Sequence, residues 1–106
     1  MDRLEAMRLF IRVAERGSVA AAAQQLGVAR SVVTRQIAAL EAHLGVKLMA
    51  RSTRRMTLTS AGAVYLEKCR VILGLVDAAE TDIALERVAQ EGDVERTGVR
   101  RAVSAD

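Results

Sequence analysis

Proline is absent from this sequence of 106 residues, and cysteine occurs once, at position 69. Without proline there are no proline kinks or proline turns, which suits a helical chain with tight glycine corners. A single cysteine excludes a disulfide within the chain and any metal site built from several cysteines. We therefore expect a small, mainly helical protein in a reducing cytoplasm.

Aromatic residues are almost as scarce, with one Phe, one Tyr and no Trp. Apolar residues still make up 51% of the sequence, so Leu, Ile, Val, Ala and Met must fill the core of one small domain. No apolar run is long enough to cross a bilayer, and charges interrupt the first ten residues too often for a signal peptide. We expect no interaction with a membrane.

Catalytic groups are sparse as well, because one His and one Cys leave no nucleophile–base pair and no metal cluster. We expect no enzyme activity, no cofactor and no metal site. His43 is open to two interpretations, a phosphate contact or a solvated side chain that stabilises a helix end, and we favour the second. Cys69 is either a redox switch between subunits or a small buried hydrophobe, and again we favour the second.

Charge is distributed unevenly along the chain. Residues 1–60 hold ten Lys and Arg against four Asp and Glu, a net charge of +6, whereas residues 61–106 have a net charge of −3. A basic first half followed by a mildly acidic second half indicates a head that binds a polyanion and a tail that is solvated or self-associating.

Apolar spacing predicts three helices, over residues 2–15, 19–26 and 30–43, separated by turns that contain glycine. The third helix should bury Val33, Ile37, Leu40 and Leu44 on one face and end at Gly45. The period then changes to alternation, with Val46 and Leu48 before the polar tip at 51–55 and Met56 and Leu58 after it. This pattern predicts two short strands joined by a basic hairpin.

A long helix is expected over residues 60–90, capped by Thr59 or Ser60, and the remaining residues 91–106 are expected to be a disordered tail. An apolar stripe along this helix alternates steps of four and three, the spacing of a seam between paired helices. The stripe could instead fold back on its own head, but the length of the helix favours pairing with a second copy of the chain. The candidate dimerisation residues are Tyr65, Cys69, Ile72, Val76, Ala79 and Ile83.

A short helix, a glycine turn and a second helix with apolar inner positions form a helix-turn-helix pattern. Burial of the apolar positions turns Arg30, Ser31, Thr34 and Arg35 outward near the start of the second of these helices. Arg forms a bidentate pair with guanine, and Thr contacts a base through its hydroxyl or its methyl group. The pattern therefore predicts a recognition helix for the DNA major groove.

The segment from Asp2 to Val88 closely resembles the N-terminal winged helix-turn-helix and linker helix of LysR-type transcriptional regulators. The motifs that carry the resemblance are "AERGS", "AAAQQLGV", "SVVTRQIAALEAHLGVKL" and R-x-x-R-R-x-x-L-T-x-A-G at 51–62. The resemblance implies a mainly helical head at 1–59 that binds promoter DNA and a helix at 60–90 that pairs two subunits. In the family a larger C-terminal domain binds an effector, and we expect no effector site in these residues.

Transferred by position, the resemblance makes Ser31, Thr34 and Arg35 recognition contacts, with Gln36 beside them, and assigns Arg51, Arg54 and Arg55 to the wing. The complete candidate set for DNA binding is Ser18, Arg30, Ser31, Thr34, Arg35, Gln36, Arg51, Arg54 and Arg55.

The sequence departs from the family pattern at Val19 and Met49, where Phe is usual, and at Ala20 and Ala29, where hydroxyl residues are common. Each departure should cost about 1 kcal/mol of stability without changing the fold. The leading hypothesis is a dimeric, sequence-specific DNA-binding regulator of transcription. The alternative is an interaction module that pairs with a full-length relative and blocks it, and the two missing caps give this alternative some support.

Overall fold

The structure, a computed structural model, describes residues 1–52 and 55–97, with side chains up to residue 92. The chain divides into two compact units, the first from Met1 to Leu73 and the second from Gly74 onward. The first unit therefore includes the start of the last helix as well as everything before it. The two units are described in turn.

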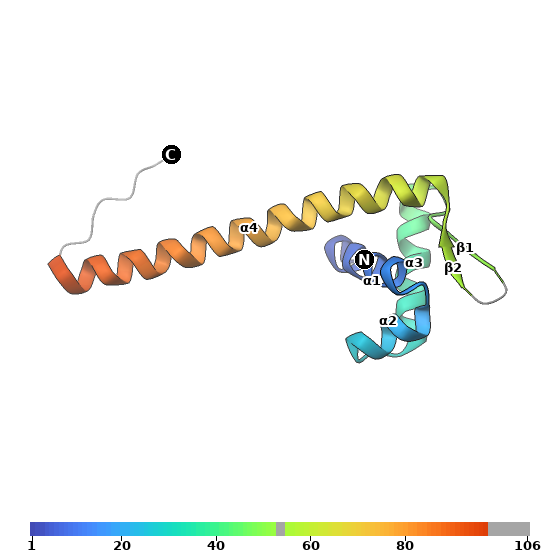
Figure 1. Cartoon of the computed structure of the whole chain (residues 1–106), viewed down its shortest axis with the longest axis horizontal. Coiled ribbons are helices and arrows are strands. Elements are labelled where there is room, and N and C mark those ends of the chain that lie inside the picture. Colours follow the sequence, from blue (N-terminus) through green and yellow to red (C-terminus); the bar gives the residue numbers. More distant parts are fainter. Residues whose placement is uncertain (53–54, 98–106) are drawn as a thin grey trace. The chain divides into compact units, whose positions relative to one another are not determined.

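The first unit contains three helices, a two-stranded hairpin and the beginning of a fourth helix (Figure 1). The predicted fold class, a winged helix-turn-helix followed by a long helix, is confirmed. In chain order the elements are α1 (Arg3–Arg16), α2 (Val19–Leu26), α3 (Arg30–Leu44), β1 (Met49–Arg51), β2 (Met56–Leu58) and α4 (Ser60–Thr97).

Each helix of the head begins and ends where the local chemistry allows. The Asp2 carboxylate accepts a hydrogen bond from the Glu5 N–H, and the Ser18 hydroxyl accepts one from the Ala21 N–H, so α1 and α2 are both capped. α3 has no such cap, because Ala29 has no polar side chain. At the other end of α3, Gly45 has φ +74°, a left-handed conformation that favours glycine and stops the helix as predicted.

The core of the head lies where α1, α2 and α3 meet the start of α4. Phe10 and Leu40 are fully buried at its centre, and Ala22 and Ala23 bury the inner face of α2. Alanines at these positions let helices approach closely, which offsets the shortage of aromatic bulk. Val33, Ile37 and Leu40 are buried as predicted, but Leu44 is 38% exposed, because it follows them at the last position of α3.

The wing is an antiparallel pair in which Met49 faces Leu58 and Arg51 faces Met56. Its first strand begins at Met49, later than the alternating pattern from Val46 suggested. The reason is that the Val46 N–H donates to the Glu41 carbonyl, so Val46 is part of the turn that ends α3 rather than of the strand. Val46 is accordingly 43% exposed, whereas Leu48 is buried immediately before the strand.

The start of α4 completes the core of the head. Thr59 caps this helix, its hydroxyl oxygen accepting from the Gly62 N–H at 3.0 Å. Leu66, Cys69 and Leu73 are buried in the core cluster, and Tyr65 packs partly against it. Of the residues expected in the pairing seam, Cys69 is fully buried in the core of its own head and Tyr65 packs partly against it, because the stripe that faces the core runs through Leu66, Cys69 and Leu73. The pairing seam itself stays a prediction.

The second unit is the continuation of α4 from Gly74, which stays helical to Thr97. The helix thus passes the expected end at residue 90, since residues 91–97 contain no proline to stop it. The rest of the expected tail, residues 98–106, lies outside the described residues. No helix among the described residues is long and apolar enough to cross a membrane.

Candidate nucleic-acid interface

The first turns of α3 present a polar surface that is set by burial on the opposite side. Val33 and Ile37 are buried in the core, so the side chains between them on the helix turn away from it. Gln36 is half-buried. The outward set predicted from the sequence is confirmed as exposed, namely Arg30, Ser31, Thr34 and Arg35.

Ser18 has a structural role that limits what else it does. Its hydroxyl oxygen accepts from the Ala21 N–H at 3.1 Å and caps α2, and the residue is half-buried. A serine hydroxyl that accepts one hydrogen bond still has a proton to donate. Ser18 is therefore able to donate to an acceptor near the start of α2.

The tip of the wing is closed by its own hydrogen bonds. The Ser52 N–H donates to the Arg55 carbonyl at 2.8 Å, and the Arg55 N–H donates to the Ser52 hydroxyl at 3.3 Å. Arg51 precedes this closure and Arg55 takes part in it, and both side chains are exposed. Arg54, the third wing arginine predicted from the sequence, lies outside the described residues.

The wing is also attached to the turn between α1 and α2. The Met56 N–H donates to the Gly17 carbonyl at 3.2 Å. The Arg55 guanidinium lies against Gly17, where an added Cβ would be 3.5 Å from a guanidinium nitrogen. This attachment brings the end of the wing next to its tip, where Arg51 pairs with Met56, to the start of α2.

These segments enclose a hollow of about 210 Å³ between the starts of α2 and α3 and the wing. Among the described residues that line it none is acidic and three are arginines, which come from α3 and from the two sides of the wing tip. Its polar lining consists of Ser18, Arg30, Thr34, Arg51, Ser52 and Arg55. Such a site suits an anion with several acceptor oxygens, because Arg and hydroxyl groups both donate to phosphate.

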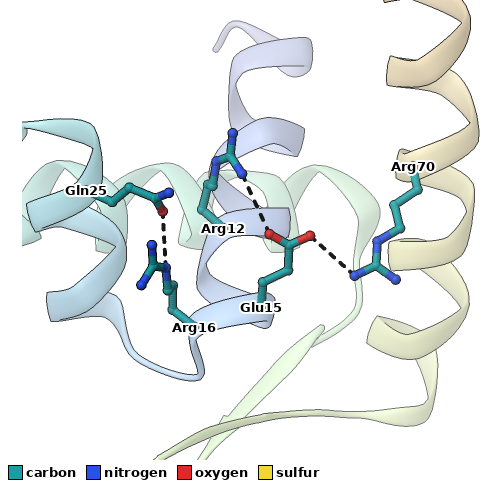
Figure 2. A network of polar contacts seen from close by, with 5 residues as sticks. All are labelled: Arg12, Glu15, Arg16, Gln25 and Arg70. Atoms are coloured by element: carbon teal, nitrogen blue, oxygen red, sulfur yellow. Dashed lines mark hydrogen bonds and ion pairs between the residues drawn. The ribbon is translucent and has the colours of Figure 1, made fainter.

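Other arginines of the head have partners of their own (Figure 2). Glu15 lies between Arg12, at 3.6 Å, and Arg70 of α4, at 3.4 Å, and Arg16 donates to the side-chain carbonyl of Gln25. None of these residues lines the hollow. Exposed ion pairs of this kind contribute little to stability. The link from Glu15 to Arg70 joins α1 to the start of α4.

The surroundings of Cys69 and His43 bear on the two interpretations that the sequence left open for each residue. Cys69 is fully buried, and burial raises the pKa of its thiol, so it stays protonated and poorly nucleophilic. This environment fits the buried hydrophobe rather than the redox switch. His43 is exposed in the last turn of α3, where the helix-end interpretation places it.

The structure brings one polar residue to the base of the wing that the sequence pattern did not indicate. Glu41 lies near the end of α3, where a negative charge opposes the helix dipole. Its side chain is 11% exposed, and it accepts hydrogen bonds from the N–H groups of Leu48 and Met49. An acid in an unfavourable position near a helix end was the only signal in the sequence.

Comparison with known proteins agrees with this geometry. The model of the bacterial regulatory helix-turn-helix protein, lysR family, matches residues 4–63. The chain belongs to the LysR family. Its head and the start of α4 thus follow the arrangement of this family, as the sequence motifs implied.

Two curated relatives show how much of such a regulator is present. TfdS of Cupriavidus pinatubonensis is 46% identical over 88 residues, which is 83% of this chain and 29% of that protein. TcbR of a Pseudomonas species is 47% identical over 88 residues, again 83% of this chain and 29% of that protein. Both are named as HTH-type transcriptional regulators. The chain spans less than a third of the length of these relatives.

Among solved structures, the DNA-binding domain of CbnR in complex with DNA aligns with a TM-score of 0.75 and 43% identity. The match covers 79% of this chain and 97% of that one. The DNA-binding domain of BenM in complex with the catB site 1 DNA aligns with a TM-score of 0.72 and 31% identity. That match covers 82% of this chain and 96% of the BenM chain.

Proposed function

We propose that this LysR-family chain binds double-stranded DNA in a sequence-specific manner and regulates transcription. The observation that carries the proposal is the hollow of about 210 Å³ directly beside the exposed start of α3, whose described lining residues include three arginines and no acid. The relatives whose solved structures contain DNA have the same fold and support it.

Within this proposal the two parts of the interface have different tasks. Arg30, Ser31, Thr34 and Arg35 face the base edges of the major groove, with Gln36 beside them, and read the sequence. Ser18 and the wing arginines Arg51, Arg54 and Arg55 hold backbone phosphates and set the register of the head.

We further propose that the chain acts as a homodimer through α4, in the cytoplasm, where promoter DNA is found. Ile72 is 41% exposed and Ile83 is 69% exposed, and an apolar surface of this kind on a helix is suited to a second copy. Val76 and Ala79 lie between them on the same stripe. Cys69 is left out of the proposed interface because it is fully buried in its own head, and Tyr65, which packs partly against the head, lies at the edge of the interface.

The alternative, a module that pairs with a full-length relative and blocks it, is favoured by one observation. α3 lacks a side-chain cap at Ala29, which weakens the start of the proposed recognition helix. Under this alternative the chain binds DNA poorly by itself but forms mixed dimers.

The two functions are separated by selecting binding sites from a random pool of double-stranded DNA with the chain alone. Enrichment of a defined motif, followed by salt-dependent binding to it in a gel-shift titration, supports the regulator. If no motif is enriched, and the chain instead removes a full-length relative from its operator, the blocking module is correct.

A further inference from the structure

Glu41 connects the end of α3 to the base of the wing. A single carboxylate oxygen, Oε2, accepts from the Leu48 N–H at 2.8 Å and from the Met49 N–H at 3.2 Å. The other oxygen lies 3.6 Å from the ammonium group of Lys47, which is 81% exposed. The two backbone bonds are the substantial part of this arrangement, since an exposed ion pair adds little.

The segment that Glu41 holds is also fixed from its other side. The Thr59 N–H donates to the Leu48 carbonyl at 3.0 Å, and the Thr59 hydroxyl donates to the Lys47 carbonyl at 2.7 Å. Gly62 packs so closely that a Cβ on it would overlap the Leu48 carbonyl. Lys47–Met49 is thus held between α3 and the start of α4, and β1 extends from it.

A hollow that is open to solvent lies between α3 and the two strands. It has a volume of about 250 Å³, and Glu41 lines it together with Val19, Met49, Arg51 and Met56. The strands therefore do not pack against α3 along their whole length. The polar attachment at Glu41 therefore matters more for the position of the wing.

Arg51 lies two residues beyond Met49 on β1, and Met56, its partner in the register, follows Arg55 directly. Glu41 attaches the wing to α3 at Met49, and the Gly17 carbonyl attaches it to the turn before α2 at Met56. Loss of the Glu41 attachment leaves the Lys47–Met49 segment held by Thr59 alone, so β1 and its Arg51 are no longer tied to α3.

We propose that Glu41 is a positioning residue for DNA binding, which acts by holding Arg51 and Arg55 beside the start of α3. The inference rests on the proposed DNA-binding function. Charge alone predicts that loss of the Glu41 carboxylate tightens DNA binding, because an acid repels phosphate. A positioning role predicts the opposite, namely that loss of the bonds to Leu48 and Met49 weakens DNA binding.

Two conservative variants of the full chain distinguish the effect of the negative charge at position 41 from the effect of side-chain length. Glu41→Gln removes the charge but keeps an oxygen at the same distance, so DNA affinity should stay within about twofold of the parent or rise. Glu41→Asp keeps the charge but is shorter by one methylene, so it should lose the bonds to Leu48 and Met49. We expect its affinity to fall about five- to tenfold, as for one or two weakened hydrogen bonds.

The affinities are measured on the selected motif, in the parent and in an Arg51→Ala/Arg55→Ala background. If Glu41 acts through these arginines, Glu41→Asp should change the DNA affinity by less than about twofold in the Arg51→Ala/Arg55→Ala background. The arginine contacts that Glu41 would position are already absent there. A loss of the same size in both backgrounds, or a loss with Glu41→Gln equal to that with Glu41→Asp, would overturn the proposal.

A second measurement needs no DNA and therefore distinguishes failure of this inference from failure of the proposed function. Amide hydrogen exchange at Leu48 and Met49 should accelerate in Glu41→Asp and remain slow in Glu41→Gln. If the parent selects no DNA motif, the proposed function fails while the exchange result still tests the attachment. If exchange at both amides is the same in Glu41→Asp as in the parent, Glu41 does not hold the wing.

Discussion

The ring of Tyr65 lies against the ring of Phe10, with 5.7 Å between the ring centroids and a tilt of 47°. These are the only two aromatic residues of the chain, and they join α1 to α4 at the core. Tilted rings at this separation contribute beyond their buried area. Since Phe10 is fully buried, Phe10→Ala should cost about 3–5 kcal/mol in the free energy of unfolding. Urea denaturation measures this loss, and a cost below about 1 kcal/mol would contradict the packing described.

Stability should fall at alkaline pH because of the buried Cys69 thiol. Burial raises its pKa in the folded chain, so the folded state holds this proton more tightly than the unfolded state does. The contribution is fully present below the unfolded thiol pKa of about 8.5 and is lost as pH rises through the folded value. Denaturation between pH 7 and 10 should show a steeper decline for the parent than for Cys69→Ala. Equal slopes would remove the thiol as the cause.

Dimerisation should depend on the exposed part of α4. Ile72→Asp/Ile83→Asp places two charges on the proposed pairing face and should give monomers in sedimentation, without unfolding the head. Val64→Asp is a matched control, because Val64 is 61% exposed on the same helix but lies outside the proposed stripe. A double variant that sediments as the parent dimer would show that the interface is elsewhere.

Arginines should differ in their effect on DNA binding according to their location. Arg55→Ala should make the slope of log K against log salt shallower by about one unit and weaken binding to most sequences equally. Arg35→Ala should cost about 1–3 kcal/mol on the preferred site and relax discrimination at one or two base pairs. Arg70→Ala serves as the control, since its partner is Glu15 and it does not line the hollow. A salt slope that changes as much with Arg70→Ala as with Arg55→Ala would contradict this assignment.

The start of α3 should gain stability from a hydroxyl. Ala29 occupies the cap position without a side-chain bond, so Ala29→Ser should add about 1 kcal/mol in thermal or urea unfolding. Ala20→Ser should add nothing comparable, because Ser18 already caps α2. The expectation that Ala20 deprives its helix of a cap is thereby corrected. A gain at Ala20 as large as that at Ala29 would contradict the capping geometry.

The helices of the head were predictable because their signals are local. Apolar spacing defined α1, α2 and α3, and Gly45 marked the end of α3 through a conformation that other residues rarely adopt. The outward residues at the start of α3 followed from the same spacing, since burying one face exposes the other. This part of the candidate site needed no knowledge of distant contacts.

The remaining features depend on contacts between residues far apart in the sequence. A stripe through Tyr65, Cys69 and Ile72 and one through Leu66, Cys69 and Leu73 have similar spacing and share Cys69. Only the position of the core decides between them. Glu41 was missed for a related reason, because its partners are backbone N–H groups, which carry no mark in the sequence.

The burial of Leu66, Cys69 and Leu73 has a practical consequence for the design of truncated and chimeric regulators. A fragment that stops before Ser60 loses three core side chains together with the Thr59–Gly62 cap, so it should expose apolar surface and aggregate. Exchange of heads between related regulators should therefore be made within a continuous helix, with Ser60–Leu73 transferred along with the head to which they belong.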